Sequence, residues 1–472
     1  MKVLRTVVMA VSLLGGVLLH NMVQAKTQEP AGSKEPLQQL SPSSYEYYGG
    51  LWAQPTLTGD WGGLRNDLAA RGVTFDISLT EIVQGVASGG KDNSHPESGG
   101  RGLVALRVDT QKLGLWPGGF LSVEAEGNFG NSVNGSTGAL SPVNSNQVYP
   151  MPDSNEFNVP EVSFTQFFSP YFGLVAGKLD TVTTGDMNDF AHGKGDEQFF
   201  NLAFNINPLL VVSTPYSTLG GGIVILPTKD PDAAIISILA LDTNGKANSA
   251  GFDDAFDDTT VAGQARVRTD FFGLTGHQVV GATYTNKTYG SLDQNLRINL
   301  ENREISKETG SWTVYYNFDQ YLYEVKKGSG QGFGLFGRFG ASDGNPNPMN
   351  YFFSVGLGGK GVSESRPLDR FGIGYYYVDV SNPEFTRGRL AIVDGGVVLE
   401  EQTRSFLGDE QGIEAFYSLA VTPWLHLTPD LQVIWPTQEN YLNVVTADGV
   451  SIPRKEDVDT AVVLGLRMKV LF

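Results

Sequence analysis

The chain contains no cysteine in its 472 residues. This absence excludes a disulfide-stapled fold, a thiolate metal site and a cysteine nucleophile. Only five histidines are present, and none pairs with another at the spacing of metal ligands. No GxSxG turn occurs, and serine, histidine and acid are not arranged as in a recognisable hydrolase. The sequence therefore does not predict an enzyme, and it gives no reason to expect a cofactor.

Long apolar runs are also missing, except at the start of the chain. There Lys2 and Arg5 precede the run VVMAVSLLGGVLL, and Val23-Gln24-Ala25 places small residues where a signal peptidase cleaves. This pattern predicts a secretory signal peptide over residues 1–25, followed by a polar extension over residues 26–50. Loss of the two positive charges takes the formal net charge from −18 to −20. Such an acidic chain lacks the basic surface that nucleic-acid binding needs, so no nucleic acid is expected as a partner.

What the sequence does have is glycine, with 58 residues, and short segments that alternate apolar and polar side chains. No proline-rich or low-complexity linker divides the chain after residue 50, which favours one large closed architecture. In the segment FLSVEAEGNFG, Leu121 and Val123 point one way, while Glu124 and Glu126 point the other. A soluble sandwich strand would alternate in the same way, so this segment alone does not distinguish a sandwich from a barrel.

The last strand favours a barrel. In DTAVVLGLRMKVLF, one face is apolar without interruption and the other carries small and basic residues. The apolar face consists of Val462, Leu464, Leu466, Met468, Val470 and Phe472. A transmembrane strand needs about 9–11 residues, and among sheets only a closed barrel pairs every backbone group in lipid. We therefore predict an all-β, transmembrane antiparallel β-barrel. The terminal Phe472 resembles the signal that the bacterial outer-membrane barrel assembly machinery recognises, which makes that machinery an expected partner.

A resemblance to a known family rests on the segment LTGDWGGLRNDLAARGV. It resembles the N-terminal signature of the carbohydrate-selective porins, the OprB-like outer-membrane channels. Further blocks similar to the family follow in the same order: GKLD at 177–180, FFNLAF at 199–204, LFGRFGASDGNPNP at 335–348, DRFGIGYYY at 369–377, IEAFYSLAVTPWLHLTPDLQVIWP at 413–436 and GLRMKVLF at 465–472. The resemblance covers roughly residues 50–472, and it implies a porin barrel over 51–472.

Membership would imply sixteen antiparallel strands around a water-filled channel in the outer membrane. It would also imply passive diffusion of monosaccharides such as glucose into the periplasm. A general or organic-acid-selective porin on the same barrel is the alternative, and the two would be distinguished by whether the constriction charges are mixed or mostly of one sign. Expected partners are small carbohydrates, outer-membrane lipid and lipopolysaccharide. The family permits a monomer or a homotrimer.

A short periplasmic helix is expected at about residues 60–71, before the first strand. Asp60 or Thr58 can cap its first turn, Leu64 and Leu68 give it a small apolar face, and Gly72 can supply a left-handed stop. The strand that follows would turn alternate residues from Val73 to Leu79 toward lipid. Glu81 falls in the same phase, so either a bulge shifts the register or the strand has already left the hydrocarbon.

Charged residues on the inward faces are the candidates for contact with the solute. Alternation places Arg107, Asp109, Glu124, Glu126, Lys178 and Asp180 in the lumen. The block RFGASDGN adds Arg338 and Asp343, and the segment 186–200 is a candidate for a loop folded into the pore. Such side chains can bind several hydroxyls of one sugar through charge-assisted hydrogen bonds. The alternative for each is a charge that wets a wide lumen or closes a salt bridge.

Two further motifs carry weaker signals. GLGGKG at 356–361 satisfies GxGxxG, but a polar loop follows it in place of a helix, so dinucleotide binding is not predicted. GFDDAFDD at 251–258 is the one metal-like cluster of aspartates. Its spacing differs from that of an EF-hand loop, which favours an acidic surface loop over a calcium site.

Overall fold

The structure of the chain is a computed structural model. It describes residues 50–149, 157–253, 255–295, 304–382, 384–393, 396–404, 407–447 and 450–472. The expected signal peptide and the polar extension, except for residue 50, lie outside the described residues. Asp254 of the acidic segment also lies outside them.

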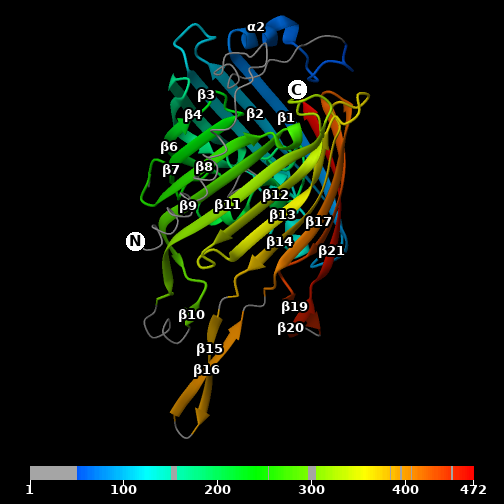
Figure 1. Cartoon of the computed structure of the whole chain (residues 1–472). Helices are drawn as coiled ribbons and strands as arrows, with labels where there is room; N and C mark the ends of the chain where they lie inside the picture. The colour runs from blue at the N-terminus through cyan, green and yellow to red at the C-terminus, as the bar shows by residue number, and fades with distance from the viewer. Residues whose placement is uncertain are drawn as a thin grey trace.

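Sixteen antiparallel strands close into a barrel, in which each strand pairs with its neighbours in chain order and β21 pairs back onto β1 (Figure 1). The strands are β1 (Val73–Gly90), β2 (Glu97–Asp109), β3 (Gly119–Gly130), β4 (Phe157–Ser169), β5 (Phe172–Asp180), β6 (Ser217–Ile225), β7 (Ala234–Asp242), β8 (Thr259–Thr269), β9 (Gly276–Gly290), β11 (Lys307–Glu324), β12 (Gly332–Ser342), β13 (Met349–Lys360), β14 (Arg370–Val380), β17 (Glu410–Thr422), β18 (Leu425–Trp435) and β21 (Asp459–Leu471). The predicted fold is confirmed.

The two ends of the barrel differ in their connections. Short turns such as 170–171 and 423–424 join the strands at one end, which we call the short-turn end. Longer segments join them at the other, the long-loop end, where two small sheets project (Figure 1). These sheets are formed by β10 (Gln294–Asn295), β15 (Glu384–Val393) and β16 (Gly396–Arg404), and by β19 (Asn440–Ala447) and β20 (Val450–Asp457).

The barrel wall follows the predicted alternation. On β21, Leu464 and Leu466 are 53% and 50% exposed, whereas Arg467 on the inward face is 1% exposed. On β3, Glu124 and Glu126 are buried on the inward side. An apolar outer face and a polar inner face are what a strand between lipid and a water-filled lumen requires. In the described parts of the chain, no helix is long and apolar enough to span a bilayer.

A short helical segment covers the short-turn end, with η2 (Trp61–Gly63) leading into α2 (Leu64–Ala70). Asp60 accepts a hydrogen bond from the Asn66 backbone N–H at 2.9 Å, and Gly72 adopts a left-handed φ of +81°. Leu64, however, is 51% exposed, so the expected apolar face does not fix the helix. Its buried residue is Arg65.

Arg65 joins the two ends of the described chain. Its guanidinium donates to the Phe472 main-chain oxygen at 2.6 Å and to the Thr56 hydroxyl at 2.7 Å. The Phe472 backbone N–H in turn donates to the Ile77 carbonyl at 2.9 Å. The helix therefore fastens the seam where β1 and β21 close the barrel.

Glu81 remains on the outward face. The pairing of β1 with β2 shows no register shift from Val73 to Gln84, and the shifts against β21 come later, between Val86 and Gly90. The Ser98 hydroxyl donates to the Glu81 carboxylate at 3.3 Å. The bulge considered from the sequence is therefore absent at Glu81.

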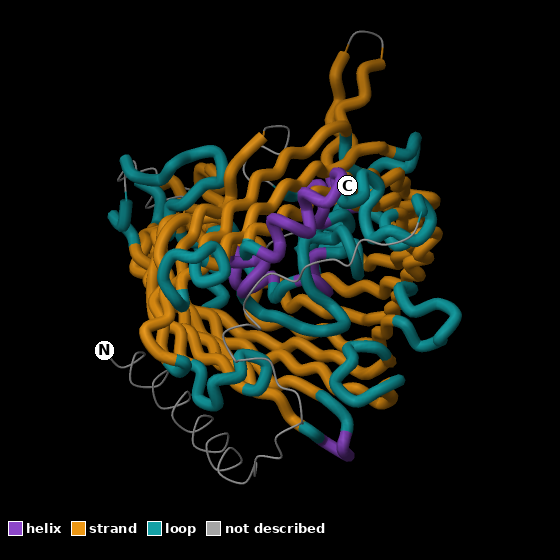
Figure 2. Tube along the Cα trace, turned by 90° about the horizontal axis from the view of Figure 1, so that it is seen from above, coloured by secondary structure: helices purple, strands orange, loops and turns teal. Residues whose placement is uncertain are grey.

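The segment between β5 and β6, residues 181–216, which we call the constriction loop, lies inside the barrel. Seen from above, loops and helices lie across the opening of the ring of strands (Figure 2). It contains α4 (Thr181–Thr184), α5 (Leu202–Asn205) and η4 (Pro208–Val212). The segment between β3 and β4 carries α3 (Asn134–Thr137) and η3 (Ser145–Gln147), and η5 (Phe271–Gly273) lies in the turn before β9.

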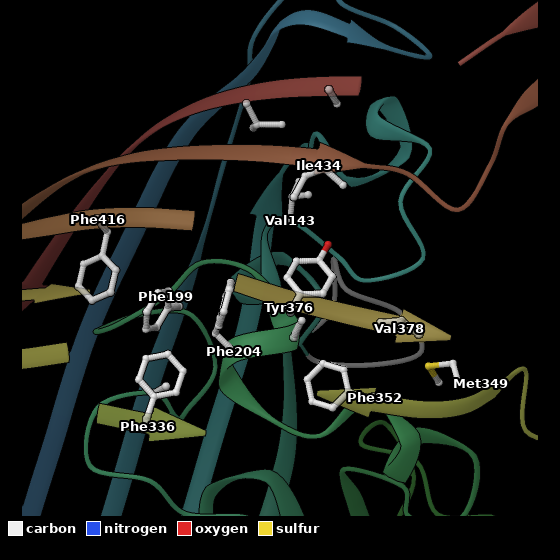
Figure 3. Packing of buried hydrophobic residues seen from close by; sticks show 14 of the residues in the cluster. Val143, Phe199, Phe204, Phe336, Met349, Phe352, Tyr376, Val378, Phe416 and Ile434 are labelled. Carbon is white, nitrogen blue, oxygen red and sulfur yellow. The ribbon is translucent and has the colours of Figure 1, made fainter. Parts of the chain in front are cut away.

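An aromatic cluster packs the constriction loop against one side of the barrel (Figure 3). Phe199 and Phe204 stack with their ring centroids 4.5 Å apart, and Phe199 also meets Phe416 of β17 at 4.9 Å. Glycines on the wall make room for these rings. A Cβ on Gly374 would lie 2.5 Å from a Phe204 ring carbon. The loop therefore fills the lumen on the side of β12 to β17 and leaves space on the opposite side.

Candidate functional site: a cavity beside the constriction loop

Buried charged groups hold the constriction loop inside the barrel. Arg338 on β12 is fully buried, and its guanidinium donates to the Asp186 carboxylate at 2.8 Å and to the Phe204 carbonyl at 2.8 Å. The same group donates to the Asp186 and Ala191 carbonyls. Arg338 thus uses its donors on the loop, so it anchors the constriction and does not face the open lumen.

Basic residues of β21 hold the middle of the loop. Arg467 donates to the Gly195 and Gln198 carbonyls, both at 2.9 Å. Lys469 pairs with Asp196 at 2.8 Å and with Glu197 at 3.0 Å. Burial acts to raise the pKa of Asp196, but the nearby Lys469 and Arg101 lower it to about 2. The carboxylate is therefore ionised at neutral pH.

Lys194 is the central anchor of the loop. Its ammonium, 4% exposed, lies 2.5 Å from Asp180, 2.8 Å from Glu124 and 3.2 Å from Glu126. Burial acts to lower the pKa of Lys194, but these three carboxylates hold it well above its ordinary value. Arg101 on β2 adds a second cation, 3.2 Å from Glu126. Three of the acids expected to line the pore therefore neutralise a lysine of the loop.

The other predicted residues lie apart from this cluster. The Asp109 carboxylate accepts hydrogen bonds from the Gln111 and Lys112 backbone N–H groups, which fixes the turn after β2. The Asp343 carboxylate accepts from the Trp312 backbone N–H at 3.1 Å at the start of the turn after β12. Both carboxylates stabilise turns.

Lys178 corrects a prediction made from alternation. It pairs with Val162, which is 44% exposed on the outer surface, and it shares the phase of Leu174, which is 42% exposed. Its ammonium donates to the Ala247 and Ser249 carbonyls of an outer loop at 2.7 and 2.6 Å. Lys178 therefore lies outside the lumen, because the inward phase of β5 belongs to the odd-numbered residues.

Asp180 lies in the lumen for a different reason from the predicted one. It has the outward phase of Lys178, but β5 ends at this residue and the chain turns into the barrel. There its carboxylate caps α4 by accepting from the Val182 and Thr183 backbone N–H groups. The end of the strand, and not its alternation, brings Asp180 to Lys194.

A cavity of about 470 Å³ remains between the constriction loop and the walls of β2 to β9. One part of its lining is polar: Arg107, Ser122, Glu161, Ser163, Thr183, Gln264, Arg266 and Tyr315. The other part is apolar: Phe120, Phe167, Val175, Leu179, Val224, Ile235, Leu239 and Leu241. Of the predicted residues, only Arg107 and Asp180 line this cavity.

The charges around the cavity are of both signs. Arg107 donates to the Asp76 carboxylate at 2.6 Å, and their side chains are 36% and 40% exposed. Arg266 lies 3.6 Å from Asp189 on the constriction loop. The inward phase of TFDISLT, opposite Phe75 and Ile77, was the signal that could have identified Asp76. Nothing local in the sequence marks Glu161 or Arg266 as neighbours of Arg107.

Comparison with known proteins agrees with this geometry. A family model described as the carbohydrate-selective porin, OprB family, matches residues 96–472. The chain belongs to this family. The match begins after the segment 57–73, which carried the strongest part of the resemblance, and it includes the cavity lining from Arg107 onward.

A solved structure of an OprB porin has the same fold. The high-pH structure of Pseudomonas putida OprB is 19% identical, with a TM-score of 0.69, and the match covers 90% of this chain and 100% of that chain. The low-pH structure of the same protein is 17% identical, with a TM-score of 0.48 and coverage of 89% and 99%. A loop-deletion mutant of OmpT from Vibrio cholerae is 12% identical, with a TM-score of 0.44 and coverage of 85% and 99%. No curated protein gives a significant match.

Membership of the OprB family establishes a porin of the bacterial outer membrane for the diffusion of carbohydrates. Barrels of this kind have short periplasmic turns and longer extracellular loops. The short-turn end, with α2 and the last residue of the chain, is therefore periplasmic, and the constriction loop enters the lumen from the extracellular side.

Proposed function

We propose that this porin passes monosaccharides such as glucose through the cavity beside the constriction loop. The observation that supports this proposal is the mixed lining, in which polar groups from β2 to β4 lie beside aliphatic side chains from β5 to β7. A pyranose has hydroxyls around its ring and C–H groups on its faces. Such a solute can exchange water for both kinds of contact in one passage.

The charged groups would form hydrogen bonds with the sugar hydroxyls. The aliphatic groups would contact the C–H faces of the ring without forming hydrogen bonds to the sugar. Arg107, Asp76 and Glu161 offer donors and acceptors that form charge-assisted hydrogen bonds. Because Arg107 and Asp76 already satisfy each other and are partly exposed, each bond to a sugar replaces an existing one. Net binding then stays weak, which a diffusion channel needs for release.

The same charges favour a neutral solute over an anion. Arg107 pairs with Asp76, and Arg266 pairs with Asp189 and Asp232. Glu161 adds a further carboxyl group to the lining. A channel for organic acids would instead need unpaired positive charge where the solute passes. This argument supports the sugar porin over the alternative proposed from the sequence.

Diffusion needs no covalent step, so we propose no catalytic activity. The expected contacts with the membrane follow from the barrel. The outward apolar residues would face lipid and, in the outer leaflet, lipopolysaccharide. The segment that ends at Phe472 would be recognised by the barrel assembly machinery before Arg65 engages it in the closed barrel.

The test is single-channel conductance in a planar bilayer, titrated with glucose, a disaccharide and succinate. We expect glucose to block open channels in a saturable way, and Arg107→Gln to weaken that block about two- to tenfold, the value of one net hydrogen bond of about 0.5–1.5 kcal/mol. Lys178→Gln removes a cation outside the lumen and should leave the block unchanged. Block by succinate but not by glucose would instead support the organic-acid alternative.

A further inference from the structure

A second cluster of titratable groups lies in the lumen, apart from Lys194. Among the described residues, Asp189 of the constriction loop, His277 of β9 and Asp319 of β11 form one group whose possible ligand atoms all lie within 4.8 Å of one another. His277 is 2% exposed and Asp319 is 1% exposed, whereas the Asp189 side chain is 31% exposed. His277 and Asp319 are therefore buried in the barrel wall, and Asp189 is accessible from the lumen.

We propose that these three side chains bind a divalent transition-metal ion. The His277 Nδ1 atom lies 2.8 Å from Asp319 Oδ1 and 3.7 Å from Asp189 Oδ1. Zinc bonds of 2.0–2.1 Å in a tetrahedral site would separate neighbouring ligand atoms by about 3.3 Å. Both distances differ from that value by about half an ångström. One imidazole nitrogen and two carboxylates suit zinc and similar ions, and water would complete the coordination.

The other nitrogen of the same ring provides an independent observation. His277 Nε2 is buried, and the Asp232 Oδ1 atom lies 3.4 Å from it. A histidine that binds a metal through one nitrogen commonly donates its other N–H to a carboxylate, which orients the ring. Asp232 is placed to accept such a bond without joining the coordination.

The charge balance of the cluster also favours a cation. Asp189, Asp232 and Asp319 contact His277, and Asp230 lies 3.9 Å from Arg268 beside them. Arg266 and Arg268 supply the positive charges. With a neutral imidazole, four carboxylates and two guanidinium groups leave a net charge of −2. A divalent ion neutralises this charge, part of which lies on the buried Asp319 carboxylate.

A bound ion would connect parts of the barrel that the anchors of the loop do not join. It would tie the 189 region of the constriction loop to β9 and β11, and through Asp232 to the turn before β7. Arg266 belongs both to this cluster and to the lining of the cavity. The ion would therefore change the charge beside the pathway as well as the freedom of the loop.

The test is zinc binding to the folded barrel, purified in detergent and stripped of metal with EDTA. We expect saturable binding of one Zn²⁺ per chain by titration calorimetry. Asp189→Asn should weaken binding at least tenfold, because it removes one carboxylate ligand at a side chain that is 31% exposed. Asp232→Asn should weaken it about 10- to 100-fold, the usual effect of losing an outer carboxylate.

His95→Gln is the matched control, because His95 is exposed at the long-loop end, where its ring contacts Ser94 and Glu97. It should leave zinc binding unchanged. Migration of the unheated protein on a denaturing gel verifies that each variant is a folded barrel. Absence of saturable binding by the folded parent protein would overturn the proposal. So would binding that His95→Gln abolishes and Asp189→Asn does not affect. Neither result depends on whether sugars pass through the channel.

Discussion

Replacing Lys194 by methionine should loosen the constriction. The substitution keeps the approximate volume of the side chain but removes the ammonium that three buried carboxylates contact at 2.5–3.2 Å. Asp180, Glu124 and Glu126 would then share a site that is nearly closed to water, with Arg101 as the one cation still in contact with Glu126. Removal of one partner from a buried ion pair costs about 3–5 kcal/mol.

Because a factor of ten corresponds to about 1.4 kcal/mol, this loss shifts the balance between a seated and a displaced loop by about 10²-fold to about 4 × 10³-fold. Arg338 and Arg467 would still hold the flanking parts of the loop. We therefore expect movement around residue 194 and not the release of the whole loop. The pathway beside it should become wider and less constant in width.

Single-channel recording measures both effects. The Lys194→Met channel should show a larger mean conductance and greater open-channel noise at pH 7. Adding Glu124→Gln removes one of the unpaired charges and should reverse part of the change. Lys178→Met is the matched control, because this lysine lies on the outer surface and its loss should leave conductance and noise as they were. The reasoning fails if Lys194→Met behaves like Lys178→Met in a folded barrel.

Three other predictions concern stability. Asp196 has its pKa lowered to about 2, so its contribution to stability is complete above the unfolded value near 4 and is lost as the pH falls through about 2. The barrel should therefore keep its conductance from pH 7 to about pH 4, and the loop should loosen around residue 196 only as the pH approaches 2. Arg65→Ala removes a buried charged donor from the chain end and should cost about 1.5–3 kcal/mol, measured as a lower temperature of unfolding on denaturing gels. Gly374→Ala forces a methyl group against Phe204 and should cost about 1–3 kcal/mol in the same assay, whereas Gly263→Ala, which meets no atom within 4 Å, should not.

Alternation predicted the wall of the barrel because lipid on one side and polar groups on the other impose a period of two. It assigned Glu124, Glu126 and Arg107 correctly to the inner face. It placed Lys178 wrongly on the inner face. Leu174, four residues earlier on β5, is exposed on the outer surface, so Lys178 also points outward. A period of two assigns faces only after one residue of the strand has been placed.

The sequence could not predict which inward charges meet the solute. Lys194 lies 70 residues from Glu124 along the chain, and only the folded loop brings their charges together. The segment 186–200, a candidate pore loop in the sequence, does lie inside the barrel. Its partners on the wall, such as Arg338, were instead expected to line the pore. Ion pairs between distant segments leave no local pattern, so these roles become visible only in the structure.

The anchors explain why so few charges remain for the solute. A barrel of sixteen strands encloses an aqueous channel that is wide compared with a monosaccharide, and the inserted loop is what narrows it. A loop surrounded by water would not stay inserted without strong contacts, since exposed ion pairs contribute little. The buried pairs of Lys194 and Arg338 provide those contacts, at the cost of the charges they use. The width of the pathway and its preference among solutes therefore depend on different residues, the first on the anchors and the second on Arg107 and its neighbours.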